Sequence, residues 1–434
     1  MDAYLIEGGH SLRGRVEISG SKNAALPCLF ASLLTQDPLF LYRVPGVRDI
    51  KVAAKLLERL GKTVKFGEGK LEIREGEVSK EAQREIVAPY DLIKQMRASV
   101  LAAGPMLARW GKARVSMPGG CAIGLRPIDI HLDGLRAMGA SVEMAGGDMV
   151  LTAPAKGLHA IRYRLKFPSV GATENLMLAA ALLRGTTVLE RAAREPEIED
   201  LAELLKKMGA GVQGAGTSRI KIKGAKRLNG AGHTIIPDRI ETGTFILLAA
   251  IVPGSSVQIA SCQPAHNAAV IKLCRQAGVD AQAGDGVISV KTGSQFRPKP
   301  VSIKTAVYPG FATDLQPLWM AFMARSKGKA KIQETIFENR FLHAAEMNRL
   351  GAKISVKGDT ALIEGIPTLV GAPVMAGDLR AGAGLIAAAL TAKGMSKISR
   401  IYHVDRGYEN LEMKLTALGA KIERFEEVRY KRVS

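Results

Sequence analysis

Cysteine is scarce in this sequence. The 434 residues contain four cysteines, Cys28, Cys121, Cys262 and Cys274. No two of them form a CxxC pair, and no group of Cys and His residues has the spacing of a zinc site. The sequence therefore indicates neither a disulfide framework nor a structural metal, and we expect a protein of the reducing cytoplasm.

Long apolar runs are missing as well. The opening residues, MDAYLIEGGHSLRGRVEISG, contain no basic segment that leads into an apolar run. The longest apolar stretches, near Ala24 to Leu34 and Phe245 to Val252, are well short of the roughly 18 residues that a membrane span needs. We therefore expect neither export nor a membrane span.

Aromatic residues are few, whereas basic residues are abundant. The chain has 61 Lys and Arg against 41 Asp and Glu, a formal net charge of +20. Such a charge attracts anions, from nucleic acid to membrane surfaces to small phosphorylated metabolites. Binding of single-stranded nucleic acid needs exposed aromatic side chains among the basic ones, and an aromatic content of 5% argues against it. A basic nucleic-acid-binding repeat protein remains the alternative from a different functional class.

A short pattern occurs six times along the chain. It is a helical apolar stripe that ends on glycine and is followed by an alternating strand, as in LERLGKTVKF from Leu57. The closing glycines lie 68 to 78 residues apart, at Gly61, Gly139, Gly209, Gly278, Gly351 and Gly419. Each is expected just after a helix, where the chain turns in a left-handed conformation that glycine adopts most readily.

A second pattern, an Ala/Leu-rich helix followed by a strand, precedes each copy, as in GATENLMLAAALLRGTTVLERAA from Gly171. Together the two patterns predict a βαβαββ-like module, with the Ala-rich helices buried on most sides. A chain of 434 residues exceeds what one hydrophobic core usually supports. We therefore predict an α/β (α+β) protein of two domains, with three modules in each.

Cys121 has the surroundings of a working cysteine. Its segment, PGGCAIGLRPID, combines the thiol with three glycines and with Arg126 five residues on. Glycines allow close approach of the backbone to a ligand, and a guanidinium activates a thiol or holds an anionic substrate beside it. Most free cysteines are small buried packing residues, but these neighbours favour a reactive role here.

Other charged residues gather near the starts and ends of the repeated helices. Lys22, in SGSKNAA, precedes an Ala/Leu helix, where it can meet a phosphate, although an exposed lysine at a helix start is the simpler interpretation. The acids around Arg239 are explained equally well by structural ion pairs. The further candidates are Arg97, Asp314, Arg340, Arg380 and Arg406. Taken together they form a pattern, because helix ends and loops converge when modules pack around one axis.

With these segments in view, the chain resembles the enolpyruvyl transferase family (EPSP synthase-like), in the branch that uses UDP-N-acetylglucosamine. The resemblance runs from Met1 to about Glu427. Its motifs are SGSKNAA at Lys22, MRAS at Arg97, PGGCAIGLRPID at Cys121, SVGAT at Ser169, AAREPEI at Glu195, PDRIETGTF at Asp238, TD at Asp314, FENRF at Arg340, DLR at Arg380 and RIYHVDRGYE at Arg406.

The resemblance implies a two-domain inside-out α/β barrel built from six βαβαββ repeats, three per domain, with helices inside and sheets outside. The first domain would span residues 22–236, and the second would combine residues 1–21 with residues 237–434. The active site would lie in the cleft between them, and the loop that carries Cys121 would fold over it.

The implied reaction moves the enolpyruvyl group of phosphoenolpyruvate onto the 3′-hydroxyl of UDP-N-acetylglucosamine and releases phosphate, the first committed step of peptidoglycan biosynthesis. The partners would be these two small molecules, with no cofactor, no nucleic acid and no membrane, and a monomer is favoured. Phosphoenolpyruvate carries a phosphate and a carboxylate, and arginine offers planar bidentate geometry to both. By resemblance its ligands would be Lys22, Asn23, Arg126 and Arg406 around the phosphate and reacting centre, and Arg340 and Arg380 on the carboxylate.

Catalysis is implied for Cys121, Asp314, Lys22 and Arg406. Cys121 would donate a proton to C3 of phosphoenolpyruvate and can also add to C2, and fosfomycin, an epoxide antibiotic, would alkylate it. Asp314 would take the proton of the 3′-hydroxyl, and a tetrahedral ketal would follow. A positioning role for Asp314 is the rival, because a carboxylate is a weak base unless closure dehydrates it.

The resemblance also implies a pocket for UDP-N-acetylglucosamine, with Glu195, Asp238 and Glu338 as polar support. Its residues would be Arg97, Arg126, Pro127, Ile128, Asp129, Ile130, Phe167, Pro168, Ser169, Val170, Asp314 and Ile336. The chain departs from some relatives by having Phe167 in place of a lysine, and Ala312 where a proline precedes Thr313.

Two alternatives stay within the fold. EPSP synthase runs the same chemistry on shikimate 3-phosphate, but that branch lacks the cysteine loop around Cys121. A catalytically silent paralogue is disfavoured because the set of Lys22, Cys121, Asp314, Arg340, Arg380 and Arg406 is intact.

Overall fold

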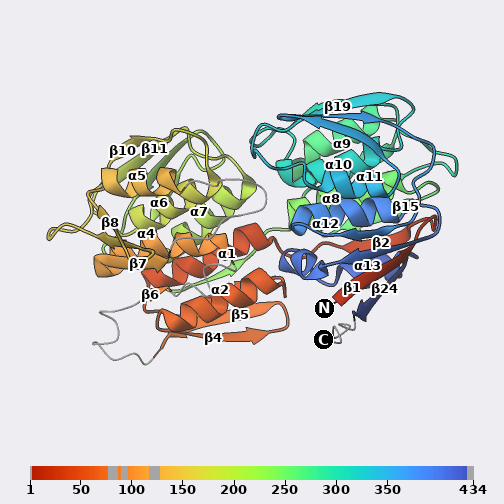
Figure 1. The fold of residues 1–434 in the computed structure, drawn as a ribbon. Helices are drawn as coiled ribbons and strands as arrows, with labels where there is room; N and C mark the ends of the chain where they lie inside the picture. Colours follow the sequence, from red (N-terminus) through yellow and green to blue (C-terminus); the bar gives the residue numbers. More distant parts are fainter. Residues whose placement is uncertain (1, 77–86, 89–95, 117–127, 428–434) are drawn as a thin grey trace, which may run out of the picture. The chain divides into compact units, whose positions relative to one another are not determined.

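The computed structural model describes residues 2–76, 87–88, 96–116 and 128–427 (Figure 1). They fall into two compact units. The first unit holds the described residues from Gly20 to Ile236, and the second unit holds those before Gly20 and after Ile236. Each unit has its own hydrophobic core. The assignment of enzyme domains to residues 22–236 and to residues 1–21 with 237–434 stays a prediction.

The first unit contains three four-stranded sheets among its described residues. Its strands are β3 (Leu39–Tyr42), β4 (Lys62–Gly67), β5 (Lys70–Glu75), β6 (Val87–Ala88), β7 (Lys112–Ser116), β8 (Ser141–Ala145), β9 (Asp148–Thr152), β10 (Arg162–Arg164), β11 (Thr186–Glu190), β12 (Gly211–Gln213), β13 (Arg219–Lys223) and β14 (Ala231–Thr234). The strand orders are β14-β3-β5-β4, β6-β7-β9-β8 and β10-β11-β13-β12.

The second unit repeats this plan. Its strands are β1 (Asp2–Glu7), β2 (Arg13–Glu17), β15 (Ser256–Ala260), β16 (Asp280–Ala283), β17 (Val287–Lys291), β18 (Ile303–Lys304), β19 (Lys329–Gln333), β20 (Lys353–Lys357), β21 (Thr360–Glu364), β22 (Pro373–Met375), β23 (Met395–Ser399) and β24 (Lys421–Glu426). The strand orders, from one edge to the other, are β22-β23-β1-β24, β16-β17-β15-β2 and β18-β19-β21-β20.

All six sheets share one pairing scheme. In the sheet β6-β7-β9-β8, the first pair is parallel and the two other pairs are antiparallel. The same holds for β18-β19-β21-β20 and for the other four sheets, with β16-β17-β15-β2 taken from its β2 edge. Parallel strands need a crossover. A helix supplies it for four of the six parallel pairs, as Val170–Ala180 does between β10 and β11, whereas the pairs β3–β14 and β2–β15 join strands far apart in the chain. The predicted α/β class with six βαβαββ modules is confirmed.

The helices of the first unit are α1 (Lys22–Ala31), α2 (Arg48–Arg59), α4 (Ala103–Trp110), α5 (Asp129–Ala137), α6 (Val170–Ala180) and α7 (Pro196–Met208). Those of the second unit are α8 (Arg239–Ile251), α9 (Ala268–Gln276), α10 (Gln316–Met323), α11 (His343–Arg349), α12 (Leu379–Ala389) and α13 (Leu411–Ala417). Short 3₁₀ turns accompany them, of which η3 (Arg97–Ala102), η5 (Thr313–Leu315) and η6 (Ile401–Arg406) carry predicted site residues.

The Ala/Leu-rich helices form the inside of each unit. Every residue of α8 from Ile240 to Ile251 is buried, and so is all of α10. Helices α8, α10 and α12 pack against one another within the second unit, and sheets surround them (Figure 1). The strands expose basic residues on the outer side, as in β13, where Ile220 and Ile222 are buried between exposed Arg219, Lys221 and Lys223. Much of the positive charge therefore lies on the outer faces of the sheets.

The six glycines end their helices as predicted. Each has a positive φ, between 87° and 112°, at Gly61, Gly139, Gly209, Gly278, Gly351 and Gly419. An L side chain rarely adopts this conformation, so glycine sets the turn from helix to strand in every module. Within the described part of the chain, the structure contains no helix of sufficient length and apolarity to cross a membrane.

Candidate active site

Two buried arginines meet one carboxylate in the second unit. Asp314 lies in η5, directly before α10, and its Oδ1 is 3.3 Å from Nη2 of Arg340 and 3.3 Å from Nε of Arg380. Arg340 is 2% exposed and Arg380 is 4% exposed. Two buried guanidinium groups that meet at one carboxylate oxygen concentrate positive charge in a region of low polarity, which favours binding of an anion.

Both arginines keep N–H groups that the described residues do not satisfy. Nε of Arg340 and Nη1 of Arg380 are buried and have no hydrogen-bond partner in the described part of the chain. Buried donors of charged groups are rarely left without an acceptor. A carboxylate or phosphate is the acceptor that matches a guanidinium best. The pair therefore has the chemistry of an anion site, and binding of a substrate carboxylate by Arg340 and Arg380 stays a prediction.

Tyr408 holds the second of these arginines in place. The guanidinium of Arg380 lies 5.2 Å from the centre of the Tyr408 ring, and the Tyr408 hydroxyl is 2.8 Å from Oγ1 of Thr244. Burial opposes the charge of Arg380, but Tyr408, Asp314 and Asp238 together raise its pKa above the ordinary value. Burial also raises the pKa of Tyr408, so its phenol stays protonated and can donate a hydrogen bond.

Arg380 lies in the first turn of α12, and the capped start of this helix fixes its position. Oδ1 of Asp378 accepts hydrogen bonds from the backbone N–H groups of Arg380, at 2.8 Å, and Ala381, at 3.0 Å, which caps the helix. His343 of α11 is buried nearby, and burial lowers its pKa to about 4, with Asp378 opposing this shift and Arg340 adding to it. His343 is therefore neutral at pH 7 and adds no charge beside Arg340.

Arg406, Ile336 and Glu338 also lie in the second unit. Arg406 ends η6, which packs against α12. Ile336 is half-buried, and its backbone N–H donates to Oε1 of Glu334 at 2.9 Å, whereas Glu338 is exposed. Asp238 caps α8 through hydrogen bonds from Ile240 and Glu241. Its observed role is to stabilise a helix start, whereas polar support of a substrate stays a prediction.

Lys22 and Asn23 begin α1 in the first unit. Ser21 caps this helix by accepting the Ala24 N–H at 3.3 Å. Lys22 is 8% exposed, and its Nζ lies 3.2 Å from Oδ2 of Asp49, at the start of α2. Lys22 is thus not the exposed surface lysine of the simpler interpretation. Its ammonium is held by the buried carboxylate of Asp49, and contact with a substrate phosphate stays a prediction.

The predicted sugar-nucleotide residues of the first unit lie at the starts of two helices. Ile128 is buried and precedes α5, which begins with Asp129 and Ile130. Ser169 caps α6 by accepting the Ala172 N–H, and Val170 is the first residue of that helix. Phe167 and Pro168 precede the cap, with Phe167 39% exposed.

Several predicted residues lie outside the described residues. Cys121, Arg126 and Pro127 belong to this group, as does the side chain of Arg97, whose backbone begins η3. Their predicted roles therefore rest on the sequence.

Sequence reasoning missed several residues of these clusters. Asp49, Thr244 and Tyr408 received no role, because their contacts join residues far apart in the chain. Glu174 was missed too: burial and then the nearby Glu197 and Glu195 raise its pKa well above the ordinary value, which keeps it protonated. The sequence signal for Glu174 was an acidic residue inside an Ala/Leu-rich helix that was predicted to be buried.

One group of three potential metal ligands occurs among the described residues, at Cys28, Asp200 and His233. Nε2 of His233 lies 3.0 Å from Oδ1 of Asp200, and Sγ of Cys28 lies 3.9 Å from Oδ2. Lys207 Nζ, which can only donate, is 3.3 Å from Nδ1 of His233. Nε2 then carries the proton and donates it to Asp200. A hydrogen-bond chain explains the cluster, and a lysine at this distance disfavours a cation.

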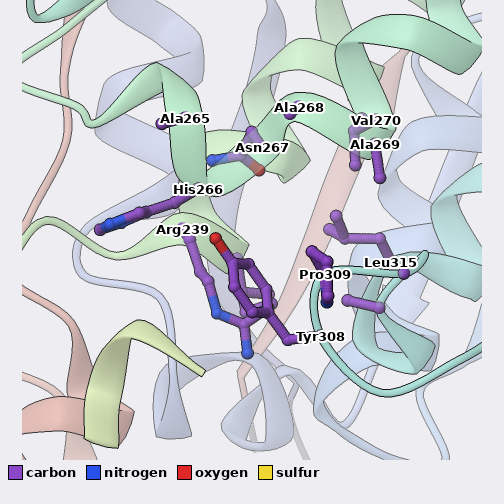
Figure 2. A pocket seen from close by; sticks show the side chains of 13 residues that line it. Arg239, Ala265, His266, Asn267, Ala268, Ala269, Val270, Tyr308, Pro309 and Leu315 are labelled. Carbon is purple, nitrogen blue, oxygen red and sulfur yellow. The ribbon is translucent and has the colours of Figure 1, made fainter. Parts of the chain in front are cut away.

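A small cavity lies beside the loop that carries Asp314. It measures about 30 Å³, enough for one or two waters, and Arg239, His266, Asn267, Tyr308 and Leu315 are among its lining residues (Figure 2). The guanidinium of Arg239 lies 5.7 Å from the centre of the Tyr308 ring. Ala312 also lines this cavity. The space is too small for either predicted substrate.

The chain is similar to proteins of one family over nearly its whole length. A model of the family described as EPSP synthase (3-phosphoshikimate 1-carboxyvinyltransferase) matches residues 6–415. Curated relatives from Rhodospirillum centenum and Trichlorobacter lovleyi are both named UDP-N-acetylglucosamine 1-carboxyvinyltransferase. Each is 49% identical to this chain, over 432 and 427 residues, with 98% of this chain and 100% of the relative covered.

Solved structures agree on the fold. The enolpyruvyl transferase NikO from Streptomyces tendae superimposes with a TM-score of 0.85 at 24% identity, covering 98% of each chain. An EPSP synthase from Acinetobacter baumannii superimposes with a TM-score of 0.73 at 16% identity, covering 98% of this chain and 100% of that chain. At such identities the likeness establishes the shared architecture alone.

Proposed function

The chain belongs to the EPSP synthase family and is a transferase, and we propose that it moves the enolpyruvyl group of phosphoenolpyruvate to the 3′-hydroxyl of UDP-N-acetylglucosamine. The choice of acceptor is supported by the name that two relatives at 49% identity share. We place the reaction in the cytoplasm, at the entry to peptidoglycan synthesis, and we expect a monomer without a cofactor.

The observation that carries the proposal is the buried pair of Arg340 and Arg380 around Asp314. Phosphoenolpyruvate carries a carboxylate. Each of the two buried guanidinium groups has an N–H donor without an acceptor among the described residues, and a carboxylate can be that acceptor. Lys22 would meet the phosphate together with Arg126 and Arg406. Cations on a leaving phosphate stabilise the charge that develops there, which speeds its departure.

The chemistry follows an addition and an elimination. A proton from the Cys121 thiol goes to C3 of phosphoenolpyruvate, C2 becomes cationic, and the sugar oxygen attacks C2 while its own proton passes toward Asp314. The product of this step is a tetrahedral ketal that still carries the phosphate. One proton then returns from C3 to the Cys121 thiolate while phosphate leaves C2, which restores the double bond, so no electrons are gained or lost.

Asp314 suits the acceptor side of this step. Arg340 and Arg380 each place a nitrogen 3.3 Å from the same oxygen, which fixes the orientation of the carboxylate. The side chain is 29% exposed, so part of it stays accessible to an incoming hydroxyl. An ionised carboxylate orients that hydroxyl for attack whether or not it takes the proton completely, and both roles require the same geometry.

The sugar nucleotide would occupy the helix starts of the first unit, at residues 128–130 and 167–170. Backbone N–H groups at a helix N-terminus attract anions, which fits a diphosphate. Phe167 offers an exposed ring in place of a lysine, so a charged contact to the diphosphate is absent at this position. The remaining phosphate contacts would come from Arg97 and Arg126.

The decisive experiment measures phosphate release from phosphoenolpyruvate with two acceptors in parallel. We expect one phosphate for each UDP-N-acetylglucosamine consumed, and none with shikimate 3-phosphate. The reverse pattern would assign the chain to the EPSP synthase reaction. Filter binding at two salt concentrations tests the nucleic-acid alternative, for which tight and steeply salt-dependent binding without phosphate release is the signature.

A further inference from the structure

Asn175 lies at the centre of the first unit, in the second turn of α6, and is completely buried. Its side chain joins three other segments. Oδ1 accepts the backbone N–H of Gly104, in α4, at 2.8 Å. Nδ2 donates to the backbone oxygen of Val100, in η3, at 3.2 Å, and lies 3.1 Å from Nδ1 of His131, in α5.

The two backbone partners fix the orientation of this amide. The Gly104 N–H can only donate, so it requires Oδ1, and the Val100 carbonyl can only accept, so it requires Nδ2. The second N–H of Nδ2 then points to His131, whose Nδ1 must accept. His131 is therefore held as the neutral tautomer, with its proton on Nε2.

Each of these segments adjoins a residue of the proposed sugar-nucleotide site. Val100 follows Arg97 by three positions in η3. His131 is next to Ile130 in α5, and α6 begins at Val170, directly after its cap Ser169. A single carboxamide thus sets the spacing of three elements that carry substrate contacts, although Asn175 itself is too deeply buried to touch a substrate.

Close packing leaves these elements little freedom apart from the hydrogen bonds. A Cβ atom at Gly104 would lie 2.4 Å from the backbone and side-chain oxygens of Asn175. A Cβ atom at Gly134, in α5, would lie 2.5 Å from Leu176. The His131 ring packs against Gly171, where an added Cβ would come within 3.2 Å. The helices approach one another so closely that a shift at Asn175 is transmitted to α4 and α5.

We infer that Asn175 is a positioning residue of the sugar-nucleotide site, acting through His131 and the η3 backbone. The inference rests on the proposed function. Without the carboxamide, the N–H of Gly104 and Nδ1 of His131 lose this partner, and the oxygen of Val100 keeps only its bond from the Ala103 N–H, so the three elements rearrange. The phosphoenolpyruvate contacts at Arg340 and Arg380 belong to the other unit and keep their own geometry.

The test compares Asn175→Ala with Thr35→Val in phosphate-release kinetics, together with calorimetric titration of UDP-N-acetylglucosamine. Thr35 is a matched control, because it is also buried in the first unit and joins two segments, donating to the Leu228 oxygen at 2.7 Å and accepting the Asp37 N–H at 3.1 Å. Both variants should melt at a lower temperature. In N175A alone, KM and Kd for the sugar nucleotide should rise about tenfold, with KM for phosphoenolpyruvate within about twofold of wild type.

His131→Leu provides a second variant that leaves Asn175 in place and removes the contact at Nδ1, so it tests the inference if N175A does not fold. We expect the same selective rise in KM for the sugar nucleotide, and a double variant whose effect is smaller than the sum of the two, because the residues act through one contact. Equal and unselective effects of N175A and Thr35→Val, or a wild-type KM in His131→Leu, overturn the inference. A wild-type protein that does not turn over UDP-N-acetylglucosamine overturns the proposed function, and the inference with it.

Discussion

Arg340 and Arg380 share a single oxygen: Nη2 of the first and Nε of the second both lie 3.3 Å from Oδ1 of Asp314. Both guanidinium groups are buried. Nε of Arg340 and Nη1 of Arg380 have no hydrogen-bond acceptor among the described residues, and a bound anion or water can supply one. The stability and the activity of this cluster should therefore respond together to anions.

Asp314→Asn should separate these two effects. Turnover should fall about a hundredfold or more, because the 3′-hydroxyl loses the anion that orients it or takes its proton. The melting temperature without ligand should fall too, and added phosphoenolpyruvate should raise it more than in wild type, because the anion then compensates both guanidinium groups. Thermal melts with and without phosphoenolpyruvate measure this.

Asp285→Asn is the matched control for that variant, since Asp285 is an exposed carboxylate in the turn between β16 and β17 of the same unit. It should change neither the rate nor the ligand-dependent melting temperature. Wild-type turnover in Asp314→Asn would remove Asp314 from the mechanism.

Tyr408→Phe should selectively weaken the binding of phosphoenolpyruvate. The hydroxyl bonds Thr244 at 2.8 Å and orients Arg380. Its loss should cost about 1 kcal/mol of unfolding free energy and raise KM for phosphoenolpyruvate several-fold. Tyr4→Phe removes the hydroxyl of another buried tyrosine of the same unit, which bonds Glu412 at 2.8 Å. It should lower stability and leave KM unchanged, and equal KM values in both variants would contradict the role of Tyr408.

Fosfomycin should modify one cysteine and no other. Cys28, Cys262 and Cys274 are buried thiols. Burial, followed by Asp200 and Glu174, raises the pKa of Cys28 well above its usual range, and burial raises that of Cys274 to about 12. None of the three offers an accessible thiolate. Intact-protein mass spectrometry should find one adduct, located at Cys121 by peptide mapping and absent from Cys121→Ser. Adducts on two or more cysteines would contradict the prediction.

Stability should fall between pH 6.5 and pH 4 through His343. Burial lowers the pKa of His343 to about 4, whereas an unfolded histidine titrates near 6.5. Between these two pKa values the unfolded chain binds a proton at His343 and the folded chain does not, so acidification favours unfolding. The loss should reach about 2 kcal/mol at pH 5. Urea denaturation of wild type and His343→Gln at pH 7 and pH 5 measures it, and parallel losses in both proteins would show that His343 contributes nothing.

The repeat could be predicted from the sequence because its signals are local. Glycine after each amphipathic helix fixes a left-handed turn, and all six predicted positions have positive φ. The Ala/Leu composition of α8 and α10 likewise predicted helices buried on every side. Such patterns depend on residues within a few turns of one another, so one sequence is enough to reveal them.

The partners of the site residues could not be predicted in this way. Thr244 and Tyr408 are 164 residues apart, and Asn175 bonds Gly104 and His131 at separations of 71 and 44 residues. Only tertiary packing brings these residues together, and a single sequence does not show which residues come into contact. Asn175 in particular lies within a helix that was predicted simply as a buried Ala-rich segment.

The position of β1 between β23 and β24 has a consequence for the order of events on the ribosome. Every sheet of the first unit is made of strands from residues 39–234, whereas β1 needs partners at residues 395–399 and 421–426. A nascent chain that has been synthesised up to Ile236 therefore already contains all the described strands of the first unit. Strand β1, in contrast, has no complete set of partners until residues 421–426 have been synthesised. Domains fold as units during synthesis, so the middle of this chain should become protease-resistant before its beginning does.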